Sequence, residues 1–230
     1  MTGEIKICGL NTVESVDAAL DAGADLVGFV QFPKSPRHVD LAKAGELSRR
    51  AAGKALRVAL AVDPDDEALE AILAVIDPEI LQLHGGETPQ RVAQIKQRFG
   101  VSVMKAIGIA EAGDLSQIEA YRDFCPRILV DAKPPATPDA LPGGNGLTFD
   151  WRLVAGLEER AGLMLSGGLN PANVGEAITL TGVAAVDVSS GVERAPGEKD
   201  PQRIVQFIEA ARAAFRQQGA EPAKEKAKSA

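Results

Sequence analysis

Eight short apolar runs recur along this chain at a spacing of roughly 25 residues, and longer amphipathic segments separate them. Each run is rich in Val, Ile and Leu and too short for a helix, which is typical of strands buried on both faces. Eight strands that alternate with helices predict an α/β protein, a single (β/α)8 TIM barrel with a parallel eight-stranded core. The predicted strands are residues 5–8, 26–30, 56–62, 80–83, 103–107, 128–131, 163–165 and 185–188.

The segments between the runs carry helix signals. Asp40 stands where a helix can begin, and Thr88-Pro89 joins an N-cap residue to a proline that suits the first helical turn. Gly100 and Gly182 follow two of these segments, where a residue in the left-handed conformation commonly ends a helix. A doubly wound open sheet is the alternative architecture, but eight evenly spaced units favour the closed barrel.

No linker divides the chain, so a single catalytic domain is predicted. Residues 1–218 are expected to form the barrel. Residues 219–230 are mainly Ala, Lys and Glu and are expected to form a flexible C-terminal tail.

Charge and hydropathy exclude several classes of function. The net charge is −7 and no basic stripe is interleaved with aromatic residues, so no nucleic-acid partner is expected. No apolar run approaches the roughly 20 residues that span a bilayer, and no secretory signal is visible, so no membrane association is expected. Cys8 and Cys125 form no CxxC pair and offer no disulfide framework. We therefore expect a cytoplasmic protein.

Two residues at the ends of predicted strands could exchange protons with a substrate. Active sites of such barrels lie at the carboxyl ends of the strands, where Cys8 and Asp131 stand. A thiol and a carboxyl group that face each other across the barrel mouth can serve as base and acid. The alternatives are that Cys8 is a small buried hydrophobe and that Asp131 only caps the loop that follows it.

Two glycine-containing segments point to a phosphate. Gly167 and Gly168 follow the seventh predicted strand, and Ser189, Ser190 and Gly191 follow the eighth. Glycine allows backbone N–H groups to approach an anion closely, and barrel enzymes commonly bind phosphate in these two loops. The sequence therefore predicts a phosphorylated small-molecule substrate.

Three further residues are candidates for substrate binding. Arg37 lies in the loop after the second strand, where its guanidinium group could clamp a carboxylate or remain a solvated surface group. His84 ends the fourth strand and could bind substrate or be structural. Asp187, in the eighth strand, could contact substrate or pair with Lys6 or Lys105 in the barrel interior.

The connection 132–147 is unusually long, and long loops without secondary structure are commonly functional. Gly144 and Gly146 give it backbone freedom, so we expect a lid that is open and mobile without ligand and closes over the substrate.

The sequence suggests no metal and no cofactor. The chain has two histidines and no His/Cys/Asp cluster, which argues against a transition-metal site. Neither a GxGxxG motif nor a P-loop is present, so no nucleotide cofactor is implied.

Eight motifs together resemble the phosphoribosylanthranilate isomerase family of tryptophan biosynthesis, in the family's order. The resemblance implies a cofactor-independent Amadori rearrangement of N-(5′-phosphoribosyl)anthranilate to 1-(2-carboxyphenylamino)-1-deoxyribulose 5-phosphate by a monomer or homodimer. It also implies Asp131 as general acid, Cys8 as general base, Arg37 at the anthranilate carboxylate and the two glycine-containing loops at the phosphate. The motifs are KICGL at 6–10, GF at 28–29 through SPR at 35–37, QLHG at 82–85, LVDA at 129–132, GGNG at 143–146, FDW at 149–151, SGGL at 166–169 and VDVSSGVE at 186–193.

A catalytic thiol near neutral pH needs a lowered pKa, because its unperturbed value is about 8.5. Lys6, two residues earlier on the same strand face, is the expected source of that help. The chain departs from the family pattern at Asn145, where Ser or Thr is more usual. It also departs at residues 58–62, which lack the family's glycine and phenylalanine.

Three rival functions remain. An aminoimidazole-type isomerase of histidine synthesis would use aspartate as the base where this chain has Cys8. A ribulose-phosphate epimerase would need a metal-binding His/Asp set. A sensor barrel would bind a phosphosugar without needing both Cys8 and Asp131.

Deletion of residues 219–230 should leave the melting temperature and the turnover within experimental error, because this segment cannot bury apolar area. Thermal unfolding and activity of the truncated and full-length proteins check this. A large fall in either quantity would show that the segment docks on the barrel or on a second subunit.

Overall fold

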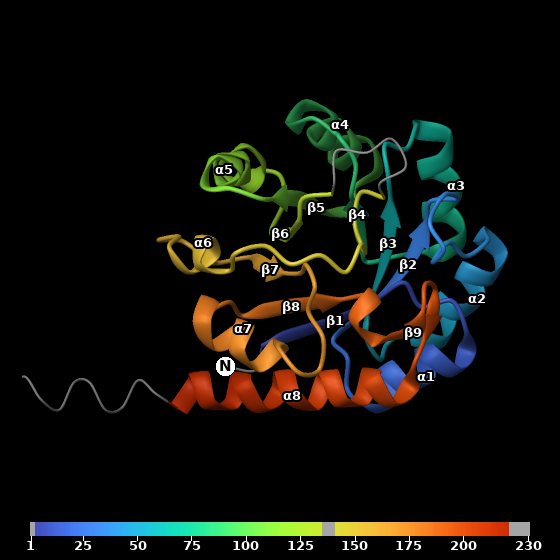
Figure 1. Ribbon diagram of the computed structural model, residues 1–230. Coiled ribbons are helices and arrows are strands. Elements are labelled where there is room, and N and C mark those ends of the chain that lie inside the picture. Colours follow the sequence, from blue (N-terminus) through green and yellow to red (C-terminus); the bar gives the residue numbers. More distant parts are fainter. Residues whose placement is uncertain (1–2, 135–140, 221–230) are drawn as a thin grey trace, which may run out of the picture.

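The computed structural model describes residues 3–134 and 141–220 of the chain. Eight parallel strands close into a barrel in the order β1 to β8, surrounded by helices (Figure 1). The predicted closed barrel is confirmed, and the alternative of an open doubly wound sheet is wrong. The strands are β1 Glu4–Cys8, β2 Leu26–Gln31, β3 Leu56–Ala61, β4 Ile80–Leu83, β5 Ser102–Ile109, β6 Arg127–Ala132, β7 Leu163–Leu165 and β8 Ala185–Val188.

Helices follow the strands and begin where the sequence signals them. Asp40 accepts a hydrogen bond from the Lys43 amide at the start of α2, and Thr88 does the same for Arg91 at the start of α4. The helices are α1 Val13–Asp21, α2 Leu41–Ala51, α3 Asp66–Ile76, α4 Pro89–Phe99, α5 Ser116–Arg122, α6 Arg152–Ala155, α7 Val174–Thr181 and α8 Pro201–Ala220, with the 3-10 turns η1 Ala112–Leu115 and η2 Ser190–Val192.

The last helix runs further than the sequence predicts. Because α8 continues to Ala220, the first two residues of the predicted tail, Gly219 and Ala220, are helical. The remainder of that tail lies outside the described residues. None of the helices in the described ranges is long and apolar enough to cross a membrane.

Two apolar layers hold the barrel together. The outer layer packs the strands against the helices, and its members include Ile7, Phe29 and Val130. The inner layer fills the barrel axis with small and branched side chains, which the scarcity of aromatic residues requires. Its members are Leu26, Val58, Ile80, Met104, Ala106, Leu129, Met164 and Ala185.

A small antiparallel hairpin follows β8 and is not part of the repeating strand–helix pattern. Its strands are β9 Glu193–Ala195 and β10 Glu198–Lys199. Gly197 joins them with φ of +82°, a conformation that favours glycine. Both Glu193 and Lys199 point inward and are buried.

Parallel strands place all their carboxyl ends at one edge of the barrel. Cys8 ends β1, Asp131 lies near the end of β6, and His84 directly follows β4. The loops after β7 and β8 open at the same edge, so the fold gathers the predicted site residues at one mouth.

Helix packing makes opposite predictions for two glycines that lie inside helices. A Cβ at Gly45 of α2 would lie 2.8 Å from the carbonyl oxygen of Val75, so helix α3 leaves no room for it. A Cβ at Gly175 of α7 would come no closer than 4.0 Å to its nearest neighbour, the Cβ of Ala214. Gly45→Ala should therefore lower the free energy of unfolding by about 1–2 kcal/mol despite the better helix propensity of Ala.

Gly175→Ala is the matched control and should raise the free energy of unfolding by up to about 1 kcal/mol. Denaturant unfolding of both variants beside the parent protein measures the difference. Equal stabilisation by the two substitutions would contradict the close contact between α2 and α3.

Candidate active site

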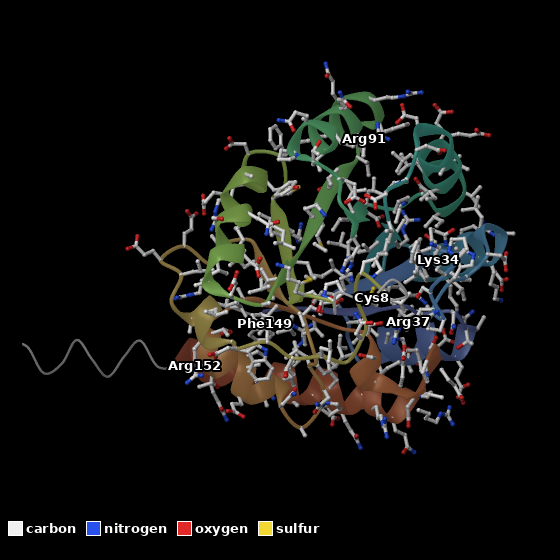
Figure 2. The ribbon with its side chains drawn as sticks, turned by 45° about the horizontal axis from the view of Figure 1, so that its top comes forward. Cys8, Lys34, Arg37, Arg91, Phe149 and Arg152 are labelled. Atoms are coloured by element: carbon white, nitrogen blue, oxygen red, sulfur yellow. The ribbon has the colours of Figure 1, made fainter. Side chains whose placement is uncertain are left out.

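A cavity lies at the mouth of the barrel and is lined by most of the predicted site residues; its space amounts to about 750 Å³ when the part open to solvent is included. Figure 2 labels two of them, Cys8 and Arg37, near the middle of the molecule, with Lys34 and Arg91 further out. The lining includes Cys8, Arg37, His84, Asp131, Asp187, Gly144, Gly146, Gly167, Gly168, Ser189 and Ser190.

One wall of the cavity is apolar. Val30 and Phe32 from β2 and the loop after it, with Leu60 and Val62 from β3 and the loop after it, pack around the cysteine at position 8. The departure of residues 58–62 from the family pattern therefore supplies part of this wall. Such a surface suits a flat aromatic group, and the rest of the lining includes carboxylates and hydroxyls.

The thiol of Cys8 is almost completely buried, with 3% of the residue exposed. This burial raises the pKa of Cys8 above its usual value, and the nearby Lys6 ammonium opposes the shift without overcoming it. The pKa of Cys8 is thus shifted upwards, whereas the sequence analysis expected Lys6 to lower it. A Cβ at Gly28 would lie 3.0 Å from the Cys8 sulfur, so glycine at this position makes room for the thiol.

Lys6 and Asp187 form an ion pair inside the barrel. The Nζ of Lys6 donates to Oδ1 of Asp187 at 2.7 Å, and the Ser166 hydroxyl donates to Oδ2 at 3.0 Å. Burial acts to lower the pKa of Lys6, but the Asp187 carboxylate outweighs it and the pKa is raised. Asp187 therefore pairs with Lys6 and also lines the cavity, whereas Lys105 pairs with Glu87 at 3.0 Å.

Asp131 lies beside His84. Its Oδ1 accepts from the amide of Ala132 at 2.8 Å, and its Oδ2 lies 3.5 Å from Nε2 of His84. The other imidazole nitrogen lies 3.1 Å from the side-chain nitrogen of Gln82. With this amide donating to Nδ1, the imidazole proton is on Nε2 and faces Asp131. The sequence analysis did not single out Gln82, although the motif at 82–85 contains it.

Arg37 is 5% exposed and is therefore not a solvated surface residue. Its Nε and Nη2 donate to the two carboxylate oxygens of Glu193 at 2.7 and 2.8 Å. Two donors of the guanidinium group, Nε and Nη2, which could have bound a substrate carboxylate together, are thus occupied by Glu193. The remaining nitrogen, Nη1, faces Gly144, where a Cβ would lie 2.5 Å away.

The segment 141–147 covers the mouth of the barrel. A Cβ at Gly143 would lie 2.6 Å from Nε2 of His84 and 2.8 Å from Oδ2 of Asp131. Gly144 and Gly146 have positive φ, but Asn145 does not, and its side-chain nitrogen Nδ2 donates to the carbonyl oxygen of Leu141 at 2.8 Å. Asn145 thus closes a turn of this segment. Residues 135–140 of the predicted lid lie outside the described residues, and its motion stays a prediction.

The two glycine-containing loops meet at the cavity. Gly167 and Gly168 have φ of +83° and +65°, and a Cβ at Gly168 would collide with Thr148. A Cβ at Gly191 would collide with the backbone of Leu169, so this glycine lets the loops after β7 and β8 approach each other. Gly191 thus shapes the predicted phosphate cradle by this packing, whereas Ser189 and Ser190 line the cavity.

Within residues 3–134 and 141–220, no group of three or more His, Cys, Asp or Glu side chains is arranged to hold a metal ion.

A closed barrel with a cavity at the carboxyl ends of its strands, lined by titratable side chains and glycine-containing loops, defines an enzyme of the (β/α)8-barrel class. The family model of N-(5′-phosphoribosyl)anthranilate (PRA) isomerase matches residues 5–210. The chain belongs to this family and is an isomerase.

Individual relatives agree with the family match. The N-(5′-phosphoribosyl)anthranilate isomerase of Azorhizobium caulinodans is 55% identical over 93% of this chain and 93% of its own length. The enzyme of that name from Brucella canis is 54% identical over 91% of this chain and 94% of its own length.

Solved structures also match. The phosphoribosyl anthranilate isomerase of Thermotoga maritima has a TM-score of 0.81 and 37% identity, covering 92% of this chain and 99% of that one. A phosphoribosyl anthranilate isomerase in complex with reduced 1-(o-carboxyphenylamino)-1-deoxyribulose 5-phosphate has a TM-score of 0.78 and 35% identity over 92% of this chain and 99% of that one.

Gly143→Ala should lower the isomerase kcat at least about tenfold, because the new methyl group would displace His84 or Asp131, and small misplacements of reacting groups cost about 10²-fold. The control is Gly113→Ala, where the nearest atom would be 3.9 Å from the new Cβ. Steady-state kinetics with a melting curve of each variant measure the effect. Full activity of Gly143→Ala would mean that segment 141–147 does not lie against these side chains during turnover.

Proposed function

We propose that this enzyme converts N-(5′-phosphoribosyl)anthranilate to 1-(2-carboxyphenylamino)-1-deoxyribulose 5-phosphate in tryptophan biosynthesis. One observation carries the proposal: the same cavity is lined by Cys8 and Asp131, by an apolar wall and by two glycine-containing loops. The names of the relatives support the same substrate.

The two ends of this substrate differ in chemistry, and so do the two ends of the cavity. The anthranilate ring packs against the apolar wall formed by Val30, Phe32, Leu60 and Val62, with its carboxylate towards Arg37. The phosphate lies in the loops after β7 and β8. A related isomerase that binds a reduced form of the product supports a site of this composition.

Asp131 is the general acid in this proposal. It donates a proton to the ribose ring oxygen, the bond from that oxygen to C1′ breaks, and the anthranilate nitrogen supplies the electron pair that forms an iminium ion. His84 lies beside Asp131 with Nε2 3.5 Å from Oδ2. The side chain of Gln82 holds the other imidazole nitrogen, which keeps the ring of His84 directed at Asp131.

Cys8 is the general base. Its thiolate removes the proton from C2′, and the electrons of that C–H bond neutralise the iminium ion and give an enolamine, which tautomerises to the ketone product. The iminium charge acidifies the C2′ proton, so a modest base suffices. The Lys6 ammonium favours the thiolate form of Cys8 and partly offsets its burial.

The competing functions fit the site less well. An isomerase of histidine synthesis would have aspartate at the end of β1, where Cys8 stands. A phosphosugar sensor needs no acid and no base.

For the assembly, a monomer or a homodimer is proposed, and the Thermotoga maritima relative is described as dimeric. A cytoplasmic location is also proposed, as the sequence leads us to expect.

Cys8→Ala and Asp131→Asn should each lower kcat by at least about 10²-fold, the scale of general acid–base catalysis, while affinity for a product analogue changes much less. Neither variant gene should restore growth without tryptophan to an auxotroph that lacks this isomerase, whereas the parent gene should. Cys125→Ala is the matched control, because that cysteine is also buried but lies in the outer apolar layer.

The pKa of Cys8 fixes the direction of the pH dependence. Since burial raises this pKa, the thiolate fraction is small at neutral pH and grows as pH rises, so kcat/KM should rise above pH 7. This rising limb should be absent from the residual activity of Cys8→Ala. Near-normal turnover of Cys8→Ala would remove this thiol from the mechanism.

A further inference from the structure

The hairpin β9–β10 brings two buried charges to the edge of the site, and the mechanism above uses neither. Glu193 and Lys199 are 6% and 5% exposed, and with Arg37 they form a group that we call the Glu193 cluster. Glu193 stands 156 positions from Arg37 in the sequence, so the contact depends on the fold.

The Glu193 carboxylate holds both cations. Its Oε1 accepts from Nε of Arg37 at 2.7 Å and from Nζ of Lys199 at 2.8 Å. Its Oε2 accepts from Nη2 of Arg37 at 2.8 Å and from the amide of Gly197 at 3.3 Å. The guanidinium group is therefore fixed in one plane, and a single nitrogen, Nη1, is directed at the segment that covers the cavity.

Lys199 connects the cluster to the loop after β8. Its Nζ donates to the carbonyl oxygen of Ser189 at 2.8 Å and contacts the Ser189 hydroxyl at 3.2 Å. That hydroxyl donates in turn to the carbonyl of Cys8 at 3.1 Å. One carboxylate thus connects Arg37, the loop after β8 and the end of β1.

The cluster contains two cations and one anion, so it carries a surplus positive charge in a poorly solvated place. A buried cation without a counter-charge is costly, and an anion delivered by a ligand would remove that cost. The carboxylate on the aromatic ring of the proposed substrate is such an anion. Glu193 already occupies the edge of the Arg37 guanidinium group that carries Nε and Nη2. The substrate carboxylate would therefore approach this group at Nη1.

We infer that Glu193 is a positioning residue that orients Arg37 for the carboxylate of the substrate, and that Lys199 ties the same orientation to the loop after β8. This inference rests on the proposed function, which assigns the substrate carboxylate to Arg37. Fixing a long side chain before binding removes the entropy cost of ordering it in the complex. Glu193 therefore controls selectivity for a carboxylated aromatic ring without touching the substrate.

A solely structural role for Glu193 makes a different prediction. If the residue only stabilised the hairpin, its loss would weaken every ligand of the cavity alike. A positioning role weakens a ligand that has the carboxylate and largely spares one that lacks it. The ratio of two affinities separates these roles, because a general loss of stability cancels from it.

The test measures calorimetric dissociation constants for two probes. One is reduced 1-(o-carboxyphenylamino)-1-deoxyribulose 5-phosphate, and the other is the same molecule without the ring carboxylate. The proteins are the parent, Arg37→Ala, Glu193→Gln and the double variant. Arg37→Ala should reduce the preference for the carboxylated probe at least about tenfold, Glu193→Gln should reduce it by a similar factor, and the double variant should show no further loss.

Two further variants complete the design. Glu87→Gln is the matched control: it removes a buried carboxylate that pairs with Lys105 at 3.0 Å, and it should leave the preference unchanged. Glu193→Asp keeps the charge on a shorter side chain and should retain an intermediate preference. It also gives a measurable protein should Glu193→Gln fail to fold.

The outcomes separate this inference from the proposed function. An unchanged preference in Arg37→Ala would show that Arg37 does not contact the carboxylate, and the substrate assignment would fail with it. A reduced preference in Arg37→Ala, together with a parental preference in Glu193→Gln or Glu193→Asp, would overturn the positioning role of Glu193 and leave the proposed function standing.

Discussion

The closure of the barrel between β1 and β8 is the constraint on which the site depends. Lys6 stands directly opposite Asp187 in the register of these strands, and their side chains form an ion pair inside the barrel at 2.7 Å. Removing either partner would leave an uncompensated buried charge, a change that commonly costs about 3–5 kcal/mol. The pair also sits beneath the mouth, beside Cys8 at the end of β1. The ion pair between β1 and β8 thus also sets the electrostatic environment of Cys8, the proposed base.

Cys8 is subject to two opposing effects of this arrangement. Burial raises its pKa, and the Lys6 ammonium acts in the opposite direction, while the Asp187 carboxylate beside Lys6 cancels part of that help. A thiol that is mostly neutral at rest is less exposed to oxidation and alkylation, since the thiolate is the reactive form. In the proposed mechanism, proton removal then depends on the acidity that the iminium ion gives to the substrate, so a weak base is sufficient.

The sequence predicted those features that depend on strand burial and strand ends. Strands buried on both faces must be apolar, so all eight were visible, and the polar residues at their ends made Cys8 and Asp131 candidates. The partner of Arg37 was not predictable, because Glu193 reaches it through a hairpin outside the strand–helix repeat. The contact of Gly143 with His84 depends on how a long loop folds back, which local propensity does not encode. Gly219 and Ala220, the first two residues of the predicted tail, lie inside α8.

The distribution of buried charge fits an anionic substrate on an acidic protein. The chain carries a net charge of −7, which repels a ligand bearing a carboxylate and a phosphate, so attraction has to come from local cations. The Lys6–Asp187 pair beside Cys8 is internally neutral, whereas the Glu193 cluster holds two cations against one carboxylate. In the proposed mechanism, a neutral centre leaves proton transfer from Asp131 and to Cys8 undisturbed by a fixed excess of either sign. In the proposed complex, the surplus positive charge of the Glu193 cluster attracts the carboxylate of the substrate, because that group keeps its charge throughout the reaction while the charge on the central atoms changes.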